Sequence, residues 1–190
     1  MADKVVVQPV EEPVTLKQAK AHLRVTHCAE DELISHLIVG ARQVCEQEIQ
    51  RPLVTQDRAL YLSAFPTRIE LAQCPVQQII LVEYLDVNGD PQVLAPSNYI
   101  LDEKSEPSWI VLAAGAIWPM TACQPNAVTV SYRAGYGDAA DVPVPIKQAM
   151  LLLIGHFYSN RENSIIGTTA TNLPFGVDAL LAQYRLRGFV

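Results

Sequence analysis

The stretch AMLLLIGHFY, at residues 149–158, constrains the fold more than any other part of the sequence. It contains no acid, lysine or arginine, and its apolar residues fall on every side of a helix. A helix without a polar face has to be covered by neighbours all round. We therefore expect other helices of this chain, or of neighbouring subunits, to bury it. Pro143 and Pro145 precede the stretch, as is typical of a helix start.

Helical periodicity also appears near the N-terminus and near the C-terminus. Residues 30–50 place apolar side chains at helical spacing, with three acids in the first turn, and Pro52 ends the pattern. A shorter helix begins at Thr15, which forms a capping box with Gln18. A last helix over residues 175–185 places apolar side chains on one side: Val177, Leu180, Leu181 and Tyr184.

Between these helices the period of the sequence changes to that of strands. Asn88-Gly89 stands between two strand-like runs and predicts a tight hairpin turn. We expect five to seven antiparallel strands over residues 53–137. The predicted fold class is α+β, with a helical core from both chain ends and an inserted small antiparallel β unit. The expected division is a flexible N-terminal arm (1–13), the helical connector core (14–52 and 143–190) and the β insertion (53–142).

Composition argues against several functional classes. The 20 acids and 14 bases among 190 residues give a net charge of -6, which disfavours tight electrostatic binding of DNA. No apolar run is long enough to cross a bilayer, and the N-terminus lacks the pattern of a signal peptide. The four cysteines form no C-x-x-C pair, which favours reduced thiols in a protein made in the cytoplasm.

Gly135 and Gly137 stand ahead of a helix as G-x-G, as in loops that hold phosphate. Ala140 occupies the place of the third glycine, and the two prolines delay the helix beyond the glycines. The preceding strands are predicted to be antiparallel, so the β-α-β crossover that such loops need is absent. We interpret the glycines as a turn and expect no bound cofactor.

A zinc site was considered for the N-terminal third of the chain, where five possible ligands gather: His22, His27, Cys28, His36 and Cys45. Zinc sites usually combine two closely spaced ligand pairs, and only the first two histidines have such spacing. We expect no metal site and predict that His156 is a hydrogen-bonded interior group. No nucleophile motif occurs, and the acids of residues 102–106 lie in a predicted turn, so no catalytic residue and no enzyme activity are expected.

Several segments, in this order along the chain, resemble the head–tail connector (adaptor, or head-completion) family of long-tailed bacteriophages. The resemblance covers residues 14–185 and is most specific over residues 134–162 and 173–185. The quoted segments are TLKQAKAHLRV, EDELISHLIVGARQVCEQEIQRPLVTQ, IELAQCPVQQIILVEYLD, SNYILD, VSYRAGYGDAADVPVPIKQAMLLLIGHFYSNRE and LPFGVDALLAQYR.

The resemblance implies a structural subunit of a homo-oligomeric ring, twelve copies in the particle and a monomer when free. Such a ring docks onto the portal protein ring after DNA packaging and receives a neck stopper or tail-completion protein. Double-stranded DNA passes through its lumen without specific binding. The implied location is the neck of the virion, after synthesis in the host cytoplasm and with no membrane contact.

The resemblance also implies that residues 172–190 form the portal interface. Its apolar anchors would be Phe175, Leu180, Leu181, Tyr184 and Phe189, and Arg185 and Arg187 would meet acidic or polar groups. The alternative for these residues is intramolecular packing of a terminal helix. Residues 160–173 are polar and aperiodic, so we expect a mobile loop there. Alternative functions are a stopper or tail-terminator ring protein, which tends to be richer in strands, or a small α+β enzyme or ligand-binding domain.

Overall fold

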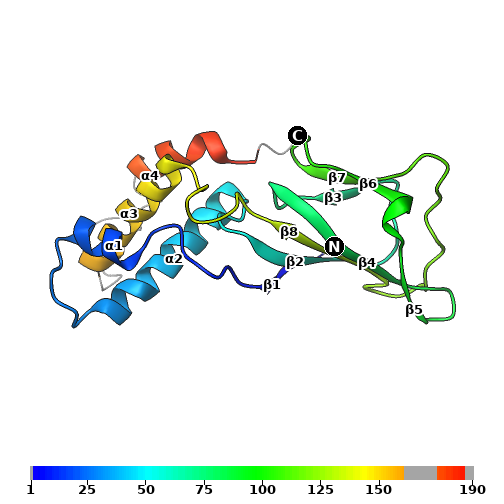
Figure 1. Ribbon diagram of the computed structural model, residues 1–190, viewed down its shortest axis with the longest axis horizontal. Coiled ribbons are helices and arrows are strands. Elements are labelled where there is room, and N and C mark those ends of the chain that lie inside the picture. The colour runs from blue at the N-terminus through cyan, green and yellow to red at the C-terminus, as the bar shows by residue number, and fades with distance from the viewer. Residues whose placement is uncertain (1, 161–174, 187–190) are drawn as a thin grey trace, which may run out of the picture. The chain divides into compact units, whose positions relative to one another are not determined.

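The computed structural model describes residues 2–160 and 175–186 and has the predicted α+β fold (Figure 1). The chain divides into two compact units. The β unit takes residues 1–10 and 55–136, and the helical unit takes residues 11–54 and 137–190. Each unit is thus built from two separate pieces of the chain, and the long β segment is inserted into the helical unit.

The helical unit contains α1 (Leu16–Leu23), α2 (Asp31–Ile49), α3 (Val144–Ser159) and α4 (Phe175–Leu181), with a 3-10 turn over Ala182–Tyr184. α3 packs against α2 and α4, and α1 packs against α2. The core of this unit includes Ile34, Ile38, Ala41, Cys45 and Ile49 from α2, Ile146, Ala149, Met150, Leu153 and Ile154 from α3, and Val177 and Leu181 from α4. The predicted helices are confirmed, since each begins and ends within a few residues of its expected position.

The start of α1 follows the predicted local chemistry. The Gln18 amide donates to Thr15 Oγ1 at 3.2 Å, and the Thr15 amide donates to Gln18 Oε1 at 2.8 Å. This reciprocal pair satisfies two amides that the first turn of a helix leaves without partners. The capping box is therefore confirmed.

The described helices of this chain cover α3 only in part, and burial of the rest by neighbouring subunits stays a prediction. Met150 and Leu153 are buried, but Val144 is 75% exposed and Leu152 is 36% exposed. His156, which was expected in the interior, is also exposed. Among the described residues, α1, α2 and α4 pack against α3, and Val144 and Leu152 stay exposed.

The β unit holds two antiparallel sheets. The strands are β1 (Ala2–Val7), β2 (Gln56–Leu62), β3 (Ile69–Leu71), β4 (Val76–Leu85), β5 (Pro91–Val93), β6 (Tyr99–Asp102), β7 (Ser108–Leu112) and β8 (Val128–Ala134). The larger sheet has the order β1-β2-β8-β4-β5, and the smaller one has the order β3-β7-β6. The hairpin predicted at Asn88-Gly89 joins β4 to β5, with Gly89 at a φ of 88°.

Alternating burial along β8 shows where the core of the β unit lies. Val128, Val130, Tyr132 and Ala134 are all buried, and the residues between them are half-buried. They belong to one apolar cluster with Ile69 and other residues of both sheets. The two sheets therefore pack their inner faces against each other, which is the usual way for such sheets to bury their apolar sides.

The expectation of a flexible arm over residues 1–13 is wrong for Ala2–Val7. These residues form β1, which pairs antiparallel with β2. The carboxylate of Asp3 accepts from Arg58 Nε at 2.8 Å and from the Tyr132 hydroxyl. These partners lie 55 and 129 residues away in the sequence, so local periodicity carried no sign of them.

Candidate assembly interface

The C-terminal helix α4 presents two kinds of side chain. Val177 and Leu181 are fully buried in the core of the helical unit. Phe175, at the first position of the helix, is 87% exposed. Gly176 lies against Leu152 of α3, since a Cβ atom at Gly176 would be 3.8 Å from Leu152 Cδ1. The helix therefore docks on its own unit and leaves a large aromatic ring in solvent.

Residues 184–186, at the end of the described C-terminal segment, form hydrogen bonds with α2 and with Arg51. The Arg51 Nε donates to the Tyr184 carbonyl at 2.7 Å, and the Leu186 amide donates to the Ile49 carbonyl at 3.1 Å. The guanidinium of Arg185 donates to Asp178 at 2.5 Å and also to Glu48. The hydrogen bond to Asp178 and the nearby Glu48 carboxylate raise the pKa of the Arg185 guanidinium.

The predicted portal anchors differ in how far the free chain buries them. Phe175 is exposed, Leu180 and Tyr184 are half-buried, and Leu181 packs inside its own unit, as the intramolecular alternative had it. Arg185 uses its charge within the chain. Arg187, Phe189 and the expected mobile loop over 160–173 lie outside the described residues, apart from Asn160 at the end of α3. The portal role of these residues stays a prediction.

The exposed apolar residues of α3, Val144 and Leu152, did not appear among the candidates from the sequence. The signal that could have indicated Leu152 is the all-round apolar pattern of residues 149–158, whereas Val144 lies ahead of that stretch. The helices that the structure describes leave Val144 and Leu152 exposed, so these side chains stay available for a neighbour.

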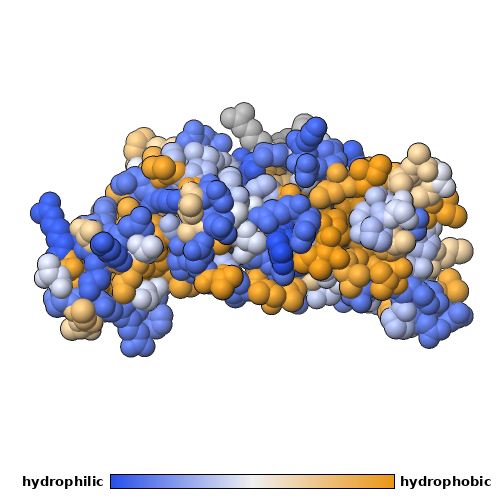
Figure 2. All heavy atoms as spheres, viewed as in Figure 1, coloured by the Kyte–Doolittle hydropathy of each residue, from blue (hydrophilic) through white to orange (hydrophobic). Residues whose placement is uncertain are grey.

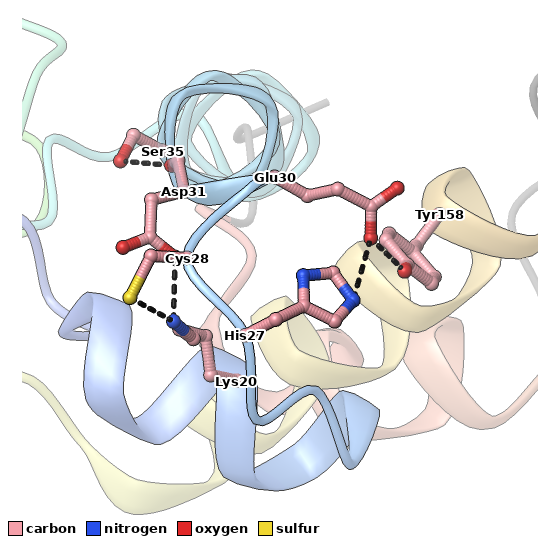
Figure 3. A network of polar contacts seen from close by, with 7 residues as sticks. All are labelled: Lys20, His27, Cys28, Glu30, Asp31, Ser35 and Tyr158. Atoms are coloured by element: carbon pink, nitrogen blue, oxygen red, sulfur yellow. Dashed lines mark hydrogen bonds and ion pairs between the residues drawn. The ribbon is translucent and has the colours of Figure 1, made fainter.

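The possible zinc ligands do not converge in the structure. Lys20 Nζ lies 2.6 Å from Asp31 Oδ1 and 3.9 Å from the sulfur of Cys28 (Figure 3). The positive charge beside Cys28 is therefore the ammonium group of Lys20. Asp31 raises the pKa of the Lys20 ammonium. His27 Nε2 is 3.8 Å from the Glu30 carboxylate, which also accepts from the Tyr158 hydroxyl at 2.5 Å (Figure 3).

Cys45, the second cysteine among the possible zinc ligands, lies in the core of the helical unit. Burial, with smaller contributions from two nearby acids, raises the pKa of the Cys45 thiol to about 12. A thiol binds zinc as the thiolate, so this side chain is a poor ligand. Within residues 2–160 and 175–186, no three His, Cys, Asp or Glu side chains gather as a metal site would require.

The G-x-G segment is a turn whose amides bind carboxylates of the same chain. Gly137 has a φ of 135°, and the next two amides, of Asp138 and Ala139, donate to Asp141 Oδ2 at 2.9 Å and to Glu11 Oε1 at 2.6 Å. A Cβ atom at Gly137 would lie 2.3 Å from Asp141 Oδ2. The place that a phosphate would take in a nucleotide-binding loop is thus filled by side chains.

The β unit also exposes apolar side chains, and Figure 2 shows an apolar area on its surface. Those at least 46% exposed are Val6, Val7, Val10, Ile80, Val87, Val93, Ile100, Ile117 and Met120. Exposed apolar side chains that gather into one area often mark an interaction site. No helix among the described residues is long and apolar enough to cross a membrane.

Residues 13–85 match the sequence model of a family described as the phage gp6-like head–tail connector proteins. The resemblance inferred from the sequence motifs is confirmed over this stretch. No protein with a curated description matches the chain.

Three solved structures of particle components share the fold. A chain in the neck of an empty gene transfer agent (GTA) particle, computed with C6 symmetry, is 23% identical, with a TM-score of 0.82 over 100% of this chain and 98% of that chain. A chain from the virion of the native particle gives the same values. A chain from the neck of the native particle, computed with C12 symmetry, is 24% identical with a TM-score of 0.75 over the same shares of the two chains.

Proposed function

We propose that this chain, which matches the gp6-like head–tail connector family over residues 13–85, is a structural subunit of a connector ring in the neck of a tailed phage or phage-like particle. The observation that carries the proposal is the likeness of fold to neck chains, which extends over 100% of this chain. A match limited to one unit would have left the other unit unexplained.

The balance of helix and strand favours the adaptor position over that of a stopper or tail-terminator ring. The described residues place 50 residues in α-helices and 45 in strands. Stopper and terminator rings are expected to be richer in strands and to lack long helices at both ends. The proposed role is mechanical joining of head and tail and involves no catalysis.

In the finer form of the proposal, a ring of about twelve copies docks onto the portal after DNA packaging and receives a stopper or tail-completion protein. DNA passes through the lumen without specific contacts. The C-terminal segment from Phe175 onward is proposed to meet the portal. An exposed aromatic ring beside half-buried apolar residues is the kind of anchor that interfaces use. Leu180 and Tyr184 would complete the anchor, whereas Leu181 would support it from inside.

The test is to mix the purified chain with its own portal ring and image the product by electron microscopy. We expect an ordered collar at the narrow end of the portal. Phe175→Ala should abolish the collar while leaving the melting temperature unchanged, because the ring touches solvent in the free chain. Met120→Ala, at a side chain 80% exposed in the β unit, is the matched control.

The two parts of the proposal fail differently. If the wild-type chain forms no collar and is missing from purified particles, the connector role is wrong. If the collar forms equally well with Phe175→Ala, the connector role stands and the portal contact lies elsewhere on the chain.

A further inference from the structure

We propose that neighbouring copies in the ring join by main-chain pairing between β1 of one copy and the open edge of β4 of the next. The inference rests on the proposed ring and adds the surface that closes it. A ring with cyclic symmetry needs two different surfaces on each subunit that fit one another. The five-stranded sheet of the β unit supplies such a pair.

Both edges are open in the part of the chain that the structure describes. β1 is the end strand of the sheet and pairs only with β2. At the other side, β5 covers β4 only along Glu83–Leu85, opposite Pro91–Val93. From Val76 to Leu81, β4 pairs with β8 alone. Each edge therefore offers a row of amides and carbonyls to another strand.

The composition of these edges favours pairing. Proteins usually protect an open edge with charged residues or proline. β1 carries Asp3 and Lys4 in its first half, but its second half, Val5–Val7 (VVV), and the segment Val76–Val82 of β4 (VQQIILV) contain no charged residue and no proline. Val6 is 62% exposed and Ile80 is 46% exposed. Uncharged runs of strand-forming residues at an open edge aggregate unless a partner covers them, so these edges indicate an assembly surface.

β1 is fixed in place before any assembly. Its Asp3 is held by Arg58 of β2 and by the hydroxyl of the buried Tyr132 of β8. An edge that is already ordered loses little conformational entropy when it pairs, and this favours association.

The directions of the strands favour a second copy as the partner. β1 is antiparallel to β2, β2 to β8, and β8 to β4, so β1 and β4 run in opposite directions. A rotation about an axis along the strands keeps every strand direction. It therefore brings β1 of one copy antiparallel to β4 of its neighbour, the arrangement that adjacent strands pair in most readily.

The pairing registers within the sheet also predict which residues meet. Lys4 pairs with Ala59, Ala59 with Ser131, and Ser131 with Leu81, so these four residues form one row across the sheet. With strands parallel to the ring axis, Lys4 of one copy lies opposite Leu81 of the next. A tilt of the strands shifts the partner along β4 to Gln78, which lies in the same open stretch of the edge.

The size of the resulting ring suits a DNA channel. Each copy adds four strands between its two open edges, about 19 Å at the usual strand spacing. Twelve copies then close at a diameter of about 70 Å measured at the sheet. This leaves room inside for a duplex and for the parts of each subunit that face the lumen.

The first test places one cysteine on each edge of the same chain. Lys4→Cys is combined in turn with Leu81→Cys or Gln78→Cys, in a chain with the exposed Cys28 and Cys123 changed to Ser. Particles assembled with these chains are oxidised or treated with a short bismaleimide. At least one pair should give covalent oligomers up to the size of the ring on a non-reducing gel. Lys4→Cys with Asn88→Cys, in the hairpin turn, should stay monomeric.

The second test adds a charge to the edge. Val6→Lys should lower the yield of joined particles by about tenfold or more. Each contact between copies would be weakened a little, and the loss of affinity accumulates because the same contact recurs at every interface of the ring. Val87→Lys, at a side chain 63% exposed in the hairpin turn, is the matched control and should leave the yield unchanged. Equal melting temperatures of the free chains exclude misfolding as the cause.

The outcomes separate this inference from the proposed function. If the chain is found in the neck, but no cysteine pair links copies and Val6→Lys assembles like the wild type, then strand pairing between copies is wrong and the ring closes by another surface. If the edge cysteines link this chain to a different protein, the partner is wrong. If the chain is missing from the neck, the proposed function itself fails.

Discussion

At the scale of single residues, Arg42 shows how a charge is kept inside the helical unit. Its side chain is 4% exposed and donates to Glu12 at 2.8 Å and to Glu46 at 2.9 Å. Two partly buried carboxylates thus share one guanidinium. Burying a charge is costly unless it is paired and hydrogen-bonded, so each member of this group depends on the others.

Removing the arginine should destabilise the fold strongly. We expect Arg42→Ala to lower the free energy of unfolding by about 3 kcal/mol or more, because it leaves two carboxylates without their cation. Urea denaturation followed by circular dichroism measures this change. Gly40→Ala, at a neighbouring position on α2 with no atom within 4 Å of the new methyl group, is the control and should stabilise slightly. Equal stability of Arg42→Ala and the wild type would contradict the assignment of this ion group.

The four thiols should divide into two classes. Cys28 and Cys123 are exposed, whereas Cys45 and Cys74 are buried. At pH 8 a maleimide should label the first two quickly and the others only after unfolding, which mass spectrometry of the intact chain measures. Because the pKa of Cys45 is raised to about 12 in the fold, its contribution to stability is complete below about pH 9 and is lost as the pH rises toward 12. Fast labelling of Cys45 in the native chain would contradict its place in the core.

At the scale of elements, the helix starts and the hairpin could be read from the sequence, and β1 could not. The Thr15 capping box and the Asn88-Gly89 turn depend on residues within four positions of each other, so local sequence determines them. β1 depends on Asp3 meeting Arg58 and Tyr132, which the chain brings together only after the sheet has formed. Its short apolar run, next to proline and acids, resembles a loose arm.

The contact that holds β1 can be tested with a double-mutant cycle. Asp3→Ala should lower the free energy of unfolding by about 2 kcal/mol, since it leaves the Tyr132 hydroxyl and the Arg58 guanidinium without their acceptor. Burial raises the pKa of the Tyr132 phenol far above its ordinary value, so the hydroxyl remains a donor up to high pH. Tyr132→Phe removes this donor, and the double mutant should lose clearly less than the sum of the two single changes. Additive losses would show that Asp3 and Tyr132 do not interact.

At the scale of the whole molecule, the acidic charge is concentrated in the β unit. That unit carries nine acids and five bases, and the helical unit carries eleven acids and nine bases. A ring through which DNA moves should not hold phosphates, because each neutralised phosphate adds affinity. The excess of acids in both units agrees with the proposal that DNA passes the ring without being bound.

This charge predicts the behaviour of the free chain toward DNA. In fluorescence anisotropy with a labelled duplex at 0.15 M salt, we expect no binding, with a Kd weaker than about 10⁻⁴ M. Lowering the salt to 0.05 M should not produce binding, because each unit carries more acids than bases and its net charge repels the phosphates. A Kd in the micromolar range that weakens steeply with salt would contradict the prediction and indicate a basic lumen.

The sequence by itself determined the α+β class, the helices at both ends, the hairpin and the family resemblance, because each of these depends on periodicity, caps, turns or motif order. Only the tertiary structure decided that α3 keeps an apolar side, that Leu181 turns inward while Phe175 stays in solvent, and that the N-terminal residues form the edge of a sheet. The physical reason is that burial and edge pairing depend on which distant segments arrive beside a residue. Spacing along the chain specifies the face of an element but not the neighbour that covers it.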